Sequence, residues 1–180
     1  MSKNEVLFSI RTFWDGTPCN ELSLFGDVRL VQTEEGIEMT ARLPHQLQPN
    51  IPDAPIGTRV ANLWEYDVVE CFLVGTDSYL EIELGAGGHF LALGFSAPRV
   101  RRNEYTDWKP DIAYRKDAGD GTWESRVLIP NSMIPAGLHS ANAFVICGNS
   151  FLCYHALPGP QPDFHQPERF PSLSFSSYDA

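Results

Sequence analysis

The segment YLEIEL, residues 79–84, alternates apolar and polar side chains without interruption. Successive side chains of an extended strand point to opposite faces, so the three aliphatic side chains are predicted to face a core. Glu81 and Glu83 then share the opposite face, with a backbone spacing of about 7 Å. The segment therefore predicts a strand with one apolar side and one side that carries two carboxylates.

A period of two residues recurs along the rest of the chain, and no long window keeps a helical period. Strands are expected at residues 27–32, 36–43, 66–74, 79–84, 89–95, 111–116, 122–129, 142–149, 151–156 and 173–176. Residues 44–57, which hold four prolines, predict a long loop, and residues 97–110 predict a second irregular segment. About ten short strands with turn residues between them predict an all-β fold, a two-sheet antiparallel β-sandwich with short helical turns.

Length and composition indicate one acidic globular domain. The 180 residues are enough for one core, and no repeat or linker divides them, so residues 1–180 are predicted to form a single β-sandwich domain. With 13 basic and 23 acidic residues the net charge is −10, which argues against nucleic acid or an anionic membrane as the main partner. Apolar runs are short, and residues 1–5 lack the pattern of a signal peptide. The four cysteines form no CxxC pair, so they are expected to be reduced thiols of a cytoplasmic protein.

Glu70 stands in the middle of an otherwise apolar strand, residues 67–73. A carboxylate is costly to bury there unless it has partners. Two interpretations remain open: Glu70 faces a wet concave surface, or it pairs with a buried arginine such as Arg126 or Arg169.

Four tryptophans are candidates for ligand contacts: Trp14, Trp64, Trp108 and Trp123. Sugars bind by stacking their C–H faces on aromatic rings, while carboxylates and amides bind their hydroxyl groups. Trp64 lies next to the proline-rich loop, is expected to open a strand, and suits a platform at the rim of a sheet. The alternative is that each tryptophan caps the core. No role is assigned to Trp14, Trp108 or the basic run at residues 99–102.

Patterns for catalysis or metal binding are weak. Glu81 and Glu83 could serve as the acid and base of a glycosidase, but any strand gives this spacing to residues two apart. The alternative is that they are two solvated residues on an outward strand face. Asp163, His165 and Glu168 form the nearest approach to a metal cluster. Residues 117–121 are similar to a calcium loop, although a hairpin turn needs the same residue types. No cofactor and no metal site are predicted, and calcium is left open.

Three motifs resemble those of a known family. NLWEYDVVECFL (residues 62–73) resembles the W-E-x-D-x-V-E-x-F strand of family 9 carbohydrate-binding modules. GTWESRVLIP (residues 121–130) and DFHQPERF (residues 163–170) are similar to two further elements of these modules, and all three occur in the family's order. A narrower likeness, over residues 63–70, 79–84 and 162–165, is to an uncharacterised family of stand-alone proteins of about this size.

The resemblance implies a β-sandwich with a ligand slot between two aromatic rings on one face. Trp64 corresponds to the first ring, and Glu70 corresponds to a glutamate that accepts hydrogen bonds from sugar hydroxyls. Phe164 takes the place of the second ring, where the sugar binders have tryptophan. Glu81 and Glu83 fall on a polar pair that is typically Arg and Asn in a sugar site.

Non-catalytic binding of a saccharide or a similarly sized polar ligand is therefore the function that the resemblance implies. Three adjacent glutamates would repel one another, which leaves room for a cationic or metal-bridged ligand. Two alternatives stay open. One is a structural or protein-interaction domain without a small-molecule ligand, and the other is a glycoside hydrolase that uses Glu81 and Glu83.

Overall fold

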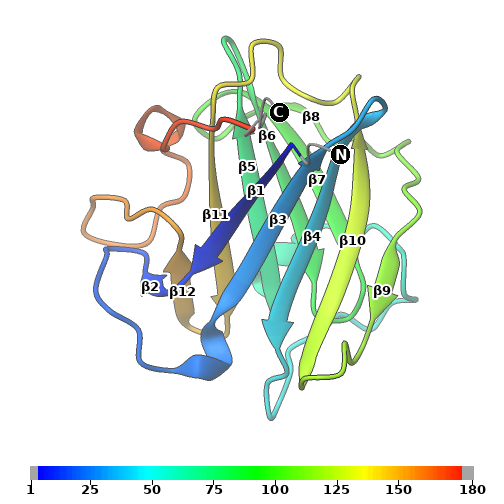
Figure 1. Ribbon diagram of the computed structural model, residues 1–180, viewed down its shortest axis with the longest axis vertical. Helices are drawn as coiled ribbons and strands as arrows, with labels where there is room; N and C mark the ends of the chain where they lie inside the picture. The colour runs from blue at the N-terminus through cyan, green and yellow to red at the C-terminus, as the bar shows by residue number, and fades with distance from the viewer. Residues whose placement is uncertain (1–3, 176–180) are drawn as a thin grey trace, which may run out of the picture.

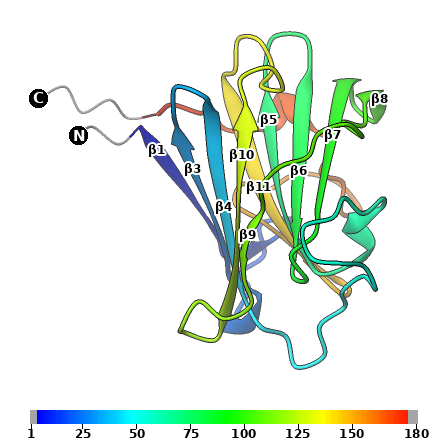
Figure 2. The same cartoon turned by 90° about the vertical axis from the view of Figure 1, so that its right-hand side faces the viewer.

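Two antiparallel sheets pack face to face in the computed structural model, which describes residues 4–175 (Figures 1 and 2). In spatial order, the five strands described in the first sheet are β1 (Glu5–Ile10), β3 (Gly26–Gln32), β4 (Gly36–Pro44), β10 (Thr122–Pro130) and β9 (Ala113–Arg115). The seven described in the second are β2 (Thr12–Phe13), β12 (Ser150–Cys153), β11 (Ser140–Cys147), β5 (Val68–Val74), β6 (Tyr79–Gly85), β7 (Phe90–Ala97) and β8 (Val100–Asn103). The predicted antiparallel β-sandwich is confirmed.

Most expected strands form, and the hairpins β3–β4 and β9–β10 pair as the turn residues indicated. Three strands were not predicted: β1, β2 and β8. In β1 an exposed Leu7 interrupts the polar-outward pattern, and every residue of β8 is exposed, so neither segment shows the expected alternation. The strand expected at residues 173–176 does not form over the described residues 173–175. The preceding Ser172 forms an isolated bridge with Ser140, and the Leu173 N–H donates to the His139 carbonyl oxygen at 2.8 Å.

Short 3-10 turns occur at η1 (Leu22–Leu24), η2 (Leu63–Glu65) and η3 (Pro167–Arg169). Trp64 therefore lies in a 3-10 turn and does not open a strand, because β5 begins only at Val68. Within residues 4–175, no helix is long and apolar enough to cross a membrane.

The seven-stranded sheet is buried on both faces. On β6, Leu80, Ile82 and Leu84 point into the core between the sheets, as the alternation predicts. A second apolar cluster covers the outer face of this sheet, where side chains such as Phe72 and Phe144 meet residues of the covering segments, including Leu63 and Phe170. Figure 2 shows the sheets edge-on, with the segment around η2 outside the seven-stranded sheet. All four cysteines are buried and unpaired, which agrees with the prediction of free thiols.

Candidate ligand-binding site

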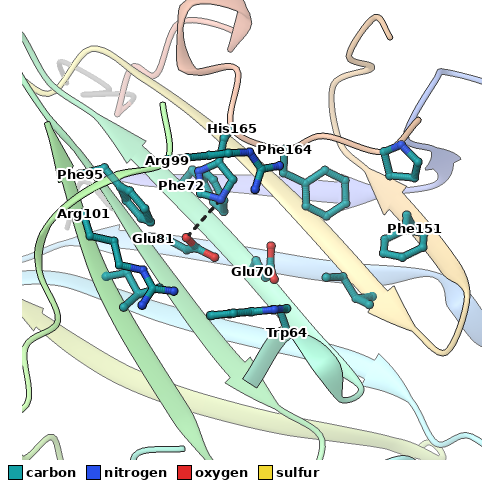
Figure 3. A pocket seen from close by; sticks show the side chains of 13 residues that line it. Trp64, Glu70, Phe72, Glu81, Phe95, Arg99, Arg101, Phe151, Phe164 and His165 are labelled. Atoms are coloured by element: carbon teal, nitrogen blue, oxygen red, sulfur yellow. Dashed lines mark ion pairs between the residues drawn. The ribbon is translucent and has the colours of Figure 1, made fainter. Parts of the chain in front are cut away.

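A pocket of about 360 Å³ opens on the outer face of the seven-stranded sheet. Its walls combine aromatic rings with charged groups, among them Trp64, Phe95, Phe164, Glu70, Glu81 and Arg101. In Figure 3 the carboxyl groups of Glu70 and Glu81 lie in the middle of a ring formed by the other labelled side chains. The sequence-predicted residues Trp64, Glu70, Glu81 and Phe164 are thus brought to one place, although they come from η2, two strands and the last long connection.

Trp64 is positioned by the residues that surround η2. Asn62, at the start of the turn, adopts the left-handed conformation with φ of +56°, and the adjacent Leu63 is fully buried in the outer apolar cluster. The indole of Trp64 remains half-buried, with the Arg101 guanidinium 5.4 Å from the ring centroid. A cation at this distance from a tryptophan ring is attracted by the π-system, so Arg101 helps to fix the wall of the pocket.

Two buried polar side chains hold the proline-rich loop beside Trp64. The carboxylate of Asp67 accepts a hydrogen bond from the Asn50 backbone N–H at 3.0 Å, and the Asp67 N–H donates to the Asn50 carbonyl at 2.8 Å. Nε2 of His89 lies 2.8 Å from the Ala54 carbonyl oxygen. Asp67 and His89 are therefore explained as supports of this loop.

Phe164 is only 8% exposed, which differs from the expectation of a ring open to water. Its ring stacks on Phe144 with centroids 4.0 Å apart and planes 12° apart, so Phe144 covers one face. The cause is the last long connection, whose aromatic residues pack on the outer face of the sheet. Phe164 still lines the pocket, as an aromatic wall rather than a free platform.

The three glutamates are buried together. Glu70, Glu81 and Glu83 are 2%, 4% and 0% exposed, and one carboxyl oxygen from each lies within 4.8 Å of the others. The register explains the cluster, because Glu70 lies directly opposite Glu83 on the neighbouring strand. Glu70 and Glu81 line the pocket, whereas Glu83, two residues after Glu81 on the same face of β6, is fully buried and does not line it.

This arrangement corrects two expectations. The interpretation of Glu81 and Glu83 as a solvated pair on an outward strand face is wrong, because the covering segments bury both side chains. Glu70 pairs with neither of the expected arginines: Arg126 lies 3.8 Å from Glu38, and Arg169 lies 3.7 Å from Glu168.

Burial shifts the acid–base properties of the cluster. Desolvation raises the pKa of Glu70 and of Glu83 well above the usual value for glutamate, and the charges of the neighbouring carboxylates add to both shifts. Desolvation also raises the pKa of Glu81 to about 7. A side-chain hydrogen bond with Glu83 and the positive charges of Arg101 and Arg99 oppose this rise. The cluster therefore retains protons near neutral pH unless another positive charge joins it.

His165 and Tyr79 belong to the same site, which the sequence analysis missed. The Tyr79 hydroxyl lies 2.7 Å from Nδ1 of His165 and accepts a hydrogen bond from the Arg99 backbone N–H at 3.1 Å. Nε2 of His165 faces Glu81, with 3.9 Å between Nε2 and Oε2 (Figure 3). Desolvation and the charge of Arg99 lower the pKa of His165 to about 4, so the imidazole is neutral at pH 7.

The two weak metal-binding patterns noted in the sequence do not form a cluster of ligands among residues 4–175. Asp163 pairs with Arg99 at 2.8 Å and Glu168 pairs with Arg169, so these acids do not gather around His165. Residues 117–121 form a hairpin turn, in which the Asp117 carboxylate accepts a hydrogen bond from the Gly119 N–H. Among residues 4–175, the cluster of three metal-ligating side chains that the fold creates is Glu70, Glu81 and Glu83.

Comparison with known proteins places the chain in a family. It is 32% identical over 182 residues to the human protein "UPF0462 protein C4orf33", with 94% of this chain and 88% of that protein covered. The mouse homologue is 34% identical, with 94% and 92% covered. The chain belongs to the UPF0462 family. No family model matches the chain.

The UPF0462 chain also shares its fold with a solved structure. A Bacteroides uniformis protein, described as "a putative carbohydrate-binding protein", matches with a TM-score of 0.73, 18% identity, 95% of this chain and 86% of that chain. At this identity the likeness shows a common β-sandwich. The expected likeness to an uncharacterised family is confirmed by the UPF0462 relatives.

Proposed function

We propose that the pocket binds a saccharide or a polar ligand of similar size and catalyses no reaction. The observation that carries the proposal is the convergence of the half-exposed Trp64 ring with the carboxyl groups of Glu70 and Glu81 in one pocket. Indole rings stack on the C–H faces of sugars, and carboxyl groups accept hydrogen bonds from hydroxyl groups. The volume of about 360 Å³ is at the small end of the range for small-molecule sites, roughly 300–1,000 Å³.

Two likenesses support this assignment. The sequence motifs resemble those of family 9 carbohydrate-binding modules, in which Trp64 and Glu70 correspond to a stacking ring and a hydroxyl acceptor. The Bacteroides neighbour, described as "a putative carbohydrate-binding protein", has the same fold.

Hydrolysis by Glu81 and Glu83 is disfavoured by their positions. Glycosidases place two carboxyl groups on either side of the scissile bond, about 5–5.5 Å or 6.5–9.5 Å apart. Glu83 is fully buried and does not line the pocket, so it cannot reach a substrate beside Glu81.

Titration calorimetry against neutral, amino and acidic saccharides tests the proposal. We expect saturable binding of at least one of these compounds, and we expect Trp64→Ala to weaken it at least tenfold because the stacking surface is lost. Trp108→Ala is the matched control, since Trp108 is also half-buried but packs edge-on against Phe90, away from the pocket.

Absence of saturable heat across the whole panel would contradict the proposal and favour a structural or protein-interaction domain. Equal weakening by Trp64→Ala and Trp108→Ala would place the ligand elsewhere. A thermal melt of each variant shows that it is folded before the titration is interpreted.

A further inference from the structure

The glutamate cluster lacks a counter-charge in register on either side. Across the neighbouring strands Glu70 is opposite Phe144, Glu83 is opposite Leu91, and Glu81 is opposite Leu93. These neighbours are buried and apolar, so they donate no hydrogen bond to the carboxyl groups. The cluster is therefore enclosed laterally by hydrocarbon.

Three of the carboxyl oxygens are buried and, within residues 4–175, have no hydrogen-bond partner outside the cluster: Oε2 of Glu81 and both oxygens of Glu83. Native structures rarely leave buried polar atoms unpaired, because each unpaired group loses its hydration without compensation. The cost is greater for charged groups that also repel one another. The cluster thus needs a positive partner, either shared protons or a cation.

The neighbouring cationic side chains have other partners. The guanidinium of Arg99 pairs with Asp163 at 2.8 Å, and that of Arg101 pairs with Glu104 at 3.2 Å while it lies over Trp64. His165 reaches no closer than 3.9 Å to Glu81, which is too long for a hydrogen bond.

We infer that Glu70, Glu81 and Glu83 form a binding site for a divalent cation at the floor of the pocket. Hard divalent cations prefer carboxylate oxygens, and ligand oxygens lie about 2.3–2.6 Å from Ca²⁺. Two oxygens that share such an ion are at most roughly 5 Å apart. The three oxygens, all within 4.8 Å of one another, meet this condition.

The location leaves part of the ion's coordination shell open. Glu83 contributes a fully buried carboxyl group that does not line the pocket, while Glu70 and Glu81 reach the ion from the pocket lining. The remaining positions face the pocket, where water or a hydroxyl group of a ligand can occupy them. His165 lies beside this opening, and its Nδ1 contact with Tyr79 turns Nε2 toward the cluster, an orientation that suits a nitrogen ligand.

The test uses the whole protein after dialysis against EDTA, titrated separately with CaCl2, MnCl2 and ZnCl2 at pH 7.5 without any saccharide. We expect saturable binding of one ion per chain for at least one of these salts, together with a rise in melting temperature that EDTA reverses. Binding should release protons, so the measured heat should depend on the ionisation enthalpy of the buffer.

Glu83→Gln, a change of nearly equal size, should weaken cation binding at least tenfold and keep the fold. Glu70→Gln should do the same, which guards against a folding defect in either variant. Glu38→Gln is the matched control, because this glutamate lies on β4 of the other sheet, close to Arg126. No saturable binding of any of the three ions at millimolar concentration, or equal affinity in Glu83→Gln and wild type, would overturn the inference and leave shared protons as the partner. The titration contains no sugar, so its result is independent of the proposed saccharide binding.

Discussion

The two sheets differ in how charged side chains are arranged on their outer faces. On the five-stranded sheet, Arg42 lies in register between Asp27 on one neighbour and Glu124 on the other, so opposite charges alternate across the strands. On the seven-stranded sheet, Glu70 lies directly opposite Glu83, with Glu81 on the same face. Like charges directly opposite one another destabilise a sheet, whereas opposite charges contribute a little stability.

Burial makes this difference larger. The side chains of Arg42 and Glu124 are 38% and 19% exposed, so water screens their interaction. The acids of the seven-stranded sheet are covered by aromatic residues and almost excluded from water. One outer face is an ordinary hydrated surface, while the other is a second core with charges placed in it, as expected of a binding site.

The largest expected effect tests whether the outer face of the seven-stranded sheet is a core. Phe72 is fully buried there, with ring centroids 5.2 Å from Phe144 and 5.3 Å from His165. Phe72→Ala should lower the free energy of unfolding by about 3–5 kcal/mol, because it removes a buried ring and leaves a cavity. Leu7→Ala on the outer face of the other sheet should change it by less than about 0.5 kcal/mol, since Leu7 is 57% exposed. Similar losses in urea denaturation would show that the two faces do not differ in this way.

The difference between the core inside the sandwich and the apolar cluster on the outer face also explains how much of the fold the sequence could predict. Alternation on β6 correctly separated the aliphatic side chains from Glu81 and Glu83, because it depends only on strand geometry. It could not show that the glutamate face is covered, since the cover comes from η2 and the last connection, which lie outside the strand. The burial of the acids and of Phe164 was therefore missed.

The candidate site was predictable to a similar degree. Trp64, Glu70 and Glu81 were identified from motifs, and they do meet in the pocket. Tyr79 could have been added, because alternation places it on the same face as Glu81. Arg101 could not, because β8 is an exposed, charged segment that owes its place to backbone pairing with β7.

The next effect concerns the pH dependence of stability in the presence of EDTA. The folded cluster holds protons that the unfolded chain has already released, because the pKa of Glu81 rises to about 7 and those of Glu70 and Glu83 rise well above 4.5. Stability is therefore greatest below the unfolded pKa values and falls as pH rises through the folded ones. Between pH 6.5 and 8 the decrease should be up to about 1.4 kcal/mol per pH unit for each retained proton.

Another ionisable group, His165, lies beside the cluster. His165 acts in the opposite direction, because its lowered pKa of about 4 makes stability rise with pH only up to about 6.5, the ordinary value for histidine. The positive charges of Arg101 and Arg99 oppose the rise in the pKa of Glu81. Glu83→Gln should flatten the decrease and raise the free energy of unfolding at pH 8, whereas Glu38→Gln should leave the profile unchanged. Parallel profiles for wild type and Glu83→Gln, from urea denaturation at several pH values, would exclude proton storage by the cluster.

The smallest expected effect concerns the hydrated face. Arg42 lies 3.4 Å from Glu124 and 2.9 Å from Asp120, and Arg42→Gln should lower the free energy of unfolding by at most about 1 kcal/mol. This loss should shrink as salt is added, because the Debye length falls from about 10 Å at 0.1 M to about 3 Å at 1 M. The change caused by Glu83→Gln should depend less on salt, since the Glu83 side chain is buried and salt screens buried charges much less than exposed ones. Equal salt sensitivity of the two variants would mean that solvent reaches the glutamates. The two outer faces would then differ in sequence but not in burial.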